Sequence, residues 1–553
     1  PEDLGHVILK CMEKDKERRY QSAGKVQSEL ERIEKGIPTT EREIPKRKPI
    51  TSKEITVTFG LKKLFIPALV VVAVIIATIA IWQLLSKKEG APIPSDKLSI
   101  AVLPFEDLSP QKDQEILCDG MADEIIAKLS RLQGWKVMNR NSVMLYKNTG
   151  KDIKEIGQEL DVVTILLGSV RKEEDDIRVT AQLVNVEDRF QIWSDIYNQK
   201  LERIFDIQSD IAEKIAEALR AKLSPEAGEQ LQKKPTENLE AYKLYLQGRY
   251  FWNKRTEEDL KKAIEYFEQA IEKDPNYALA YVGLADSYLV LPDYSSFPRK
   301  EATLKAEKAT RKALEIDNTL GEAHASLASI EWENWDWGGA EKEFKRAIEL
   351  NPGYATAHHW YAFLLMFEGR HDESIREIKL AKDLDPLSLI INANVGFMLH
   401  YARRYDEALE HYMNVIEIAP DLAWLHRYIG MAYEQKEMHK EAEKEFQRAI
   451  TLSGGFTKDL EALAHTYAMA GKREEAIEIV GELRELFKRE RASPYGIASI
   501  YAALGEKDKA FEWLEKAYEI IDSKIPYLKV DPLFDNIRTD PRFKVLLKKV
   551  GFE

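Results

Sequence analysis

The stretch AEKEFKRAIELNPGYATAHHWYAFLLMFEGRHDESIREIKLAKDLDP, residues 340–386, decides the fold because one interval recurs in it. Pro386 follows Pro352 after 34 residues, and Ser374 follows Ala340 after the same interval. Small residues continue this interval on both sides, at Ala328, Ala362, Gly396, Gly430, Ala464 and Ala498. Large apolar residues keep the same spacing at Phe344, Ile378, Tyr412 and Phe446. Agreement over so many periods predicts a repeat architecture.

A period of 34 residues with this phase resembles the tetratricopeptide repeat, a pair of antiparallel helices. The small residue on each helix lets the two helices approach closely, the large residue fills the gap between neighbouring units, and Pro ends the second helix. Two looser repeats come first, one marked by Gly248 and Phe267 and one with an insertion around residues 292–300. We predict about eight repeats over residues 240–522 and a capping segment at 523–553 that covers the last apolar face.

The candidate binding site is the concave groove of this predicted superhelix, which the first helix of each pair lines. The resemblance implies that the groove presents Trp332, His359, Phe363, Phe397, Tyr401, Arg427 and Met431. Aromatic and Arg side chains suit the binding of a protein or peptide, although packing between repeats is the alternative for each residue. We predict no catalytic, cofactor or metal site, and His358 and His359 lack further zinc ligands at a useful spacing.

Residues 97–223 alternate predicted strands and helices. Met121, Ile125 and Leu129 share one helical face, and residues 162–198 read as three strands, with apolar residues at every second position from 177 to 183. The pattern AVLPFEDLS…DGMADEI…GSVR…IRVTAQLV resembles the TolB-like domain found in bacterial membrane signalling proteins. The resemblance implies a small α/β domain and no particular ligand.

Two features of this region leave a chemical and a structural interpretation open. The carboxylates of Glu106, Asp107, Asp119 and Asp123 could hold a cation, or they could belong to ordinary turns and helix caps. Cys118 lies near a predicted helix start, so its thiol could have a lowered pKa, or it could be a plain buried cysteine.

The segment LFIPALVVVAVIIATIAIWQLL, residues 64–85, carries no charge. As a helix it would span about 33 Å, enough to cross a hydrocarbon core of about 30 Å, and we predict a transmembrane helix here. A basic juxtamembrane linker at 36–63 precedes it, and fewer positive charges follow it. This asymmetry predicts a single-pass inner-membrane protein with a cytoplasmic N-terminus and extracytoplasmic α/β and repeat domains.

The stretch KCMEKDKERRYQSA, residues 10–23, resembles the last two helices of the C-lobe of bacterial serine/threonine protein kinases. Asp15, Arg19 and Tyr20 match the family pattern, and Lys16 stands where the family has Pro. The resemblance implies a structural role for Arg19, which pairs with a Glu below the activation segment. Residues 1–35 would then be the remnant of a kinase C-lobe; a generic charged helical hairpin is the alternative.

No motif for phosphate transfer occurs in the chain: it has no GxGxxG, VAIK, HRD, DFG or GxxxxGK[ST] sequence. We expect a kinase domain, with its ATP and Mg²⁺, only before residue 1, so the enzymatic nature of the protein is left open. The formal net charge of −13 argues against nucleic acid as a ligand.

The predicted architecture is mainly α: a tetratricopeptide α-solenoid preceded by a small α/β domain, one transmembrane helix and a kinase remnant. The first functional hypothesis is the sensor or scaffold half of a receptor-type serine/threonine kinase whose array binds a protein or peptide. The second is a non-enzymatic membrane scaffold, or the same module behind an adenylyl cyclase or a winged-helix regulator. The ligand, the kinase substrate and the oligomeric state are not predicted.

Overall fold

A computed structural model describes residues 7, 11, 20, 22–34, 98–219, 225–295, 297–489 and 491–552. The chain divides into two compact units, Pro1–Glu89 and Gly90–Glu553. In the first unit the structure describes helix α2 (Ala23–Glu34). Arg19, the predicted linker at 36–63 and the predicted membrane segment at 64–85 lie outside the described residues. Among the helices that are described, none is long and apolar enough to cross a membrane.

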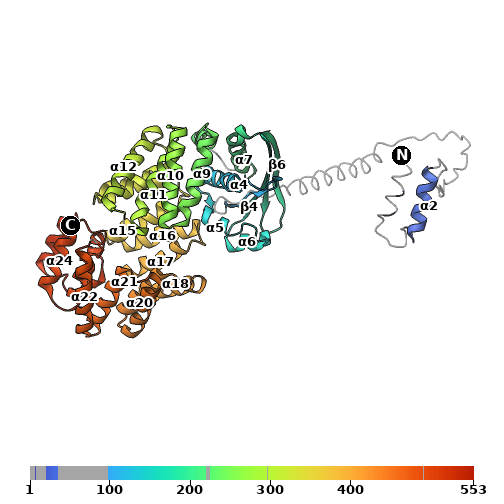
Figure 1. Ribbon diagram of the computed structural model, residues 1–553. Helices are drawn as coiled ribbons and strands as arrows, with labels where there is room; N and C mark the ends of the chain where they lie inside the picture. Colours follow the sequence, from blue (N-terminus) through green and yellow to red (C-terminus); the bar gives the residue numbers. More distant parts are fainter. Residues whose placement is uncertain are drawn as a thin grey trace, which may run out of the picture. The chain divides into compact units, whose positions relative to one another are not determined.

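An α/β region opens the second unit (Figure 1). Its sheet has the strand order β3-β1-β4-β5-β6, with β2 paired to β4; β1, β2 and β3 run parallel to their partners, and β4, β5 and β6 are antiparallel. The strands are β1 (Ser99–Val102), β2 (Glu106–Asp107), β3 (Lys136–Val137), β4 (Thr164–Glu173), β5 (Asp176–Asn185) and β6 (Gln191–Lys200). The three strands predicted over residues 162–198 are confirmed as β4, β5 and β6.

The helices of this region are α4 (Glu115–Leu129), α5 (Arg140–Met144), α6 (Ile153–Glu159) and α7 (Ile204–Ala218), with a 3₁₀ turn, η4, at Leu201–Arg203. Met121, Ile125 and Leu129 of α4 are completely buried, which confirms the predicted apolar face. Helix α4 packs against α7 and β1, so this face closes the core of the region.

Eight antiparallel helix pairs follow in the described residues, after a short helix α8 (Pro225–Gln232). Helices that follow each other in sequence lie side by side, and the pairs stack into a curved array (Figure 1). The first helices of the pairs are α9 (Leu239–Lys254), α11 (Ala278–Tyr294), α13 (Gly321–Glu333), α15 (Ala355–Phe367), α17 (Leu389–Tyr401), α19 (Ala423–Gln435), α21 (Thr457–Met469) and α23 (Pro494–Ala503). The second helices are α10 (Glu257–Lys273), α12 (Arg299–Ile316), α14 (Trp337–Leu350), α16 (His371–Leu384), α18 (Tyr405–Ile418), α20 (His439–Ser453), α22 (Arg473–Phe487) and α24 (Lys507–Glu519).

The small residues of the 34-residue series allow the close approach of the two helices in a pair. A Cβ atom on Gly396 would lie only 2.6 Å from the Tyr412 ring, and one on Gly430 only 2.7 Å from the Phe446 ring. Phe446 is completely buried, as is Phe344. The large residue also contacts the next pair: the ring of Phe344 lies 5.8 Å from Tyr361, and that of Tyr412 lies 5.8 Å from Tyr428. The large residue of each unit therefore packs on the small residue of its own pair and, as the spacing predicted, fills the gap to the neighbouring unit.

The α/β region is docked on the turns between successive helix pairs. Asp385, which follows α16 and is 1% exposed, accepts hydrogen bonds from Ser142 Oγ at 2.5 Å and from Asn141 Nδ2 at 3.0 Å. The backbone N–H of Leu387 donates to Ser142 Oγ at 2.9 Å. One repeat earlier, the N–H of Gly353 donates to the carbonyl of residue 130 at 2.9 Å. The α/β region thus contacts the same turn in two consecutive repeats.

Candidate functional site

Five of the predicted groove residues form one row of rings along the first helices of three consecutive pairs. Trp332 of α13 stacks on Phe363 of α15 with ring centroids 6.3 Å apart, and Phe363 lies 5.8 Å from Phe397 of α17. Tyr401 is 4.9 Å from Phe397, and His359 is 5.6 Å from Phe363. The array therefore places these five side chains on one continuous surface, which we call the aromatic row.

The other two predicted residues lie outside this row. Arg427 of α19 pairs with the buried carboxylate of Asp459 at 2.5 Å. Met431 packs against the cluster around Phe446 and Leu463, which is the packing alternative considered for it. Within the row, burial lowers the pKa of His359 to about 4, so its ring is neutral at physiological pH.

The C-terminal part of the chain covers the aromatic row. It consists of two 3₁₀ turns, η5 (Ile525–Lys529) and η6 (Pro532–Phe534), and helix α25 (Pro541–Lys549). We call residues 525–538 the strap. The ring of Tyr527 lies 4.7 Å from Phe367, 5.3 Å from Tyr401 and 6.2 Å from Phe397. The strap therefore fills the part of the groove that the row lines.

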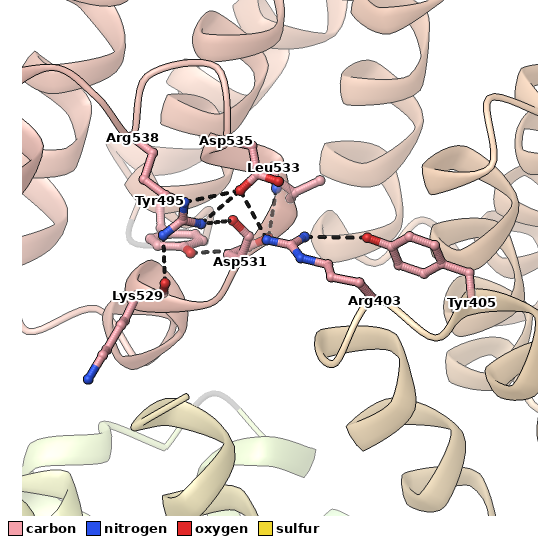
Figure 2. A network of polar contacts seen from close by, with 8 residues as sticks. All are labelled: Arg403, Tyr405, Tyr495, Lys529, Asp531, Leu533, Asp535 and Arg538. Carbon is pink, nitrogen blue, oxygen red and sulfur yellow. Dashed lines mark hydrogen bonds and ion pairs between the residues drawn. The ribbon is translucent and has the colours of Figure 1, made fainter. Parts of the chain in front are cut away.

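A buried carboxylate holds the strap against the last helix pair (Figure 2). Asp531, which is 4% exposed, accepts a hydrogen bond from Tyr495 Oη at 2.8 Å and one from the N–H of Leu533 at 3.0 Å. Burial raises the pKa of Asp531 above its ordinary value. These bonds satisfy the carboxylate within the protein and fix the bend between η5 and η6.

Two arginines extend this network to an earlier repeat (Figure 2). Arg538 donates to the carbonyls of Lys529 at 2.6 Å and Asp531 at 2.8 Å, and it pairs with Asp535 at 2.9 Å. Arg403, in the turn after α17, pairs with the same Asp535 carboxylate at 3.0 Å. The strap is thus tied at once to the last pair and to the fifth.

Helix α25 reaches the third pair as well as the last. The indole N–H of Trp337 donates to the carbonyl of Val550 at 2.9 Å, and Phe552 stacks on Trp337 at 4.7 Å. On the other side, Lys549 pairs with Glu515 of α24 at 2.7 Å. The C-terminal segment covers the end of the array, and it also bridges distant repeats.

Four cationic side chains from separate elements gather inside the curve of the array. Arg299 pairs with Glu333 at 3.1 Å, Arg427 with Asp459, and Lys524 with Glu461 at 2.5 Å. The fourth, Lys458 at the start of α21, has no carboxylate within 4 Å among the described residues. Burial lowers the pKa of Lys458 to about 8. The nearby charges of Lys524, Arg427 and Arg299 act in the same direction, and the carboxylate of Asp293 acts against them. We call these four residues the cation cluster.

The carboxylates considered as a cation site have structural partners. Asp107 accepts hydrogen bonds from the N–H groups of residues 109 and 114 at 2.9 and 2.8 Å, as expected of a turn. Asp119 pairs with Lys147 at 2.7 Å, and Asp123 pairs with Arg140 at 2.6 Å. Glu106 is exposed at the edge of the sheet. The described parts of the chain contain no group of three His, Cys, Asp or Glu residues that could hold a metal.

Cys118 is a plain buried cysteine and not a thiol of lowered pKa. It is 1% exposed, and burial, with the negative charges of Asp107 and Asp119, raises the pKa of its thiol to about 12. A thiol of this kind is unreactive at neutral pH.

The sequence predicted a capping segment at 523–553, but it predicted neither the contacts of the strap with the aromatic row nor a role for Lys458. Tyr527 and Asp531 lie beyond the last repeat, so no periodic signal marks them. Lys458 lies six residues before Ala464, the small residue of its repeat. None of the predicted groove residues occupies the equivalent repeat position, so the pattern did not mark Lys458.

Comparison with protein families identifies two kinds of region. Tetratricopeptide repeat profiles match residues 245–298, 387–453 and 495–523. A profile of the second domain of HilA/YgeH-like transcriptional regulators matches residues 95–214, the region in which we predicted a TolB-like domain.

Curated relatives share less than half of their length with this chain. A putative adenylate cyclase 3 of Rhizobium meliloti is 30% identical over 248 residues, which are 44% of this chain and 42% of that protein. The transcriptional regulator HilA of Salmonella typhimurium is 24% identical over 246 residues, 43% of this chain and 42% of that protein. A solved tetratricopeptide repeat protein from Parabacteroides merdae is 15% identical over 49% of this chain and 98% of its own, with a TM-score of 0.34. The chain therefore contains an array of tetratricopeptide repeats, preceded by a region similar to the second domain of HilA/YgeH-like regulators.

Proposed function

We propose that the repeat array is a scaffold that binds a protein or peptide partner through an acidic group of that partner. The observation that carries this proposal is the cation cluster, and in it the unpaired Lys458. Three of its four members already hold a carboxylate, whereas Lys458 stays partly exposed inside the curve without one.

A carboxylate that approaches a partly buried cation stabilises it more than it would at an open surface, because solvent screens the attraction between the two charges less there. The pKa of Lys458 is lowered mainly by burial, and the more distant carboxylate of Asp293 does not offset this effect. The aromatic row is less suited to the first contact with a partner, since Tyr527 already covers Phe397 and Tyr401 of the row and the adjacent Phe367.

The test starts from a phage-displayed peptide library selected on the full chain. We expect the selected peptides to carry Asp, Glu or a free C-terminal carboxylate, and Lys458→Gln to weaken their binding at least about ten-fold. Lys444→Gln, an exposed lysine on α20, is the matched control and should bind normally. Selected peptides without an acidic group, or equal affinity of both variants, would show that the cluster is not the binding site.

We further propose that this scaffold is the extracytoplasmic half of a membrane-anchored bacterial signalling protein, with residues 64–85 as the anchor and a serine/threonine kinase in front. The kinase resemblance of residues 10–23 and the basic flank of the apolar segment support this reading. The alternative is another effector in front of the same module; the names of the two curated relatives, an adenylate cyclase and a transcriptional regulator, favour it.

Two measurements separate these alternatives. Reading the coding sequence upstream of residue 1 should reveal HRD and DFG motifs about 100–150 residues earlier if a kinase precedes the chain. A cyclase domain or a winged helix at that place would refute the kinase. Reporter fusions on both sides of residues 64–85 test the membrane orientation, and a cytoplasmic repeat array would contradict it.

A further inference from the structure

A hollow lies where the α/β region meets the first helix pairs, apart from the aromatic row and the cation cluster. Its volume is about 330 Å³, and its wall combines residues of α4 with residues of α9, α11 and the turn before α15. This volume is at the lower end of the range of about 300–1,000 Å³ that is usual for small-molecule sites. The hollow exists only because the two regions are docked.

Two opposite charges in this wall do not meet. Asp286 of α11 is 1% exposed; one of its oxygens accepts a hydrogen bond from Ser326 Oγ at 2.6 Å, and the other has no partner. The guanidinium of Arg249 on α9 stacks on Trp252 with 4.5 Å to the ring centroid, and in the described structure no carboxylate lies within 4 Å of it. Arg249 and Asp286 are nevertheless close enough for each charge to act on the other.

The remaining polar groups of the wall also have unused hydrogen-bonding capacity. Glu322 Oε1 accepts a hydrogen bond from Asn351 Nδ2 at 2.8 Å and lies 3.8 Å from Arg131 Nη2, while Glu322 Oε2 has no partner. The side-chain oxygen of Asn351, a residue only 2% exposed, is unpartnered, and so is one oxygen of Asp123. On the donor side, Nε of Arg131 is free. The wall thus offers several acceptors and the guanidinium groups of Arg131, Arg140 and Arg249. Arg131 and Arg140 face Glu322 and Asp123, at 3.8 and 2.6 Å, so Arg249 is the guanidinium without a carboxylate in the described structure.

These unpartnered groups indicate which kind of ligand would fit the hollow. Unpartnered carboxylate and amide oxygens require N–H donors, ideally a cationic ammonium group, and a guanidinium favours a carboxylate, which it can bind through two parallel hydrogen bonds. Buried groups without partners cost free energy that a bridging ligand recovers. We infer that this hollow is a binding site for a small zwitterion, a free α-amino acid, with its carboxylate on Arg249 and its ammonium group between Asp286 and Glu322.

The repeat pattern gives the site a second, independent mark. Arg249 and Asp286 directly follow Gly248 and Ala285, the small residues of their repeats, as Phe363 follows Ala362. The repeat position that carries a ring in the fourth pair therefore carries a charge in each of the first two. The inference goes beyond the proposed peptide scaffold, since it concerns another part of the molecule and another class of ligand.

The experiment titrates the full chain, purified in mild detergent, with each of the twenty common α-amino acids by calorimetry. We expect at least one of them to bind and to raise the melting temperature. Its N-acetyl derivative and its amide should each bind at least about ten-fold more weakly, because each lacks one of the two charges. The absence of binding by every amino acid would overturn the inference, as would equal binding of the amide.

Substitutions then locate the site. Arg249→Gln and Asp286→Asn should each lower the affinity at least about ten-fold, whereas Arg448→Gln, which removes an exposed ion pair with Asp421, should leave it unchanged. Circular dichroism of each variant confirms that it is folded. Unchanged affinity in folded Arg249→Gln and Asp286→Asn proteins would place the amino acid elsewhere and refute the assignment.

Discussion

Truncation of Tyr527 should detach the strap from the aromatic row. In the Tyr527→Ala variant the contacts with the rings of Phe367, Phe397 and Tyr401 disappear. Each aromatic pair is worth about 0.5–1.5 kcal/mol beyond the buried area, and these three pairs share one ring, so they do not add fully. We expect the free energy of local opening of the strap to fall by about 2–3 kcal/mol.

Hydrogen–deuterium exchange of peptides that cover residues 525–538 measures this opening directly, because exchange reports local as well as global unfolding. A loss of about 2–3 kcal/mol corresponds to exchange about 30 to 150 times faster. Global denaturation is less suitable for this question, because it does not report the local opening of the strap.

Two further variants test whether the ring contacts are the cause. Tyr527→Phe keeps the ring and should keep the protection of the strap. Tyr250→Ala removes a tyrosine of α9 that is 43% exposed and lies outside the strap contacts, so the strap should exchange as in the natural chain. If Tyr527→Ala exchanges within about two-fold of Tyr250→Ala, the strap is held by other contacts and the reasoning fails.

Three other predictions follow from buried groups. Burial raises the pKa of Asp286 to about 6 from 3.8. The contribution of its protonated carboxyl to the free energy of unfolding is therefore complete below pH 4 and is lost as the pH rises through 6. This loss of about 3 kcal/mol should be absent in Asp286→Asn when urea unfolding is followed at pH 4 and 7. In a double-mutant cycle with Ser142→Ala and Asp385→Ala, urea unfolding should give a coupling energy of about 1.5–3 kcal/mol, because a hydrogen bond to a charged group joins the two regions; additive effects would contradict this. Maleimide at pH 7 should label the exposed Cys11 and leave Cys118 unlabelled until the protein is unfolded, as mass spectrometry of digests will show.

The repeat architecture could be read from the sequence because its cause is local. Gly430 must be small, since Phe446 of the same pair packs on it, and this requirement recurs every 34 residues. The three strands over residues 162–198 could be predicted for a similar reason, because side chains alternate between the two faces of a strand. The resemblance to the tetratricopeptide repeat named the five side chains of the aromatic row, but it also named Arg427 and Met431, which lie outside the row.

Contacts between distant parts of the chain could not be read in this way. Tyr527 reaches Phe397 only because the array curves back toward its own C-terminal segment, and a segment without a period has no register from which to predict that contact. Asp385 meets Ser142 because the α/β region docks on the turns between repeats. Nothing in the sequence around Tyr527 or Asp385 indicates which residue each of them contacts.

The sequence by itself therefore determined the repeats, the strands and the residue types along the concave side, all of which depend on spacings within one or two elements. The tertiary structure decided which part of the concave side is covered by the strap, where Lys458 is left without a carboxylate, and where Arg249 and Asp286 face one hollow. The physical reason is that burial and pairing of a charge depend on its neighbours in space, and in this protein those neighbours come from helix pairs and regions far apart in the chain.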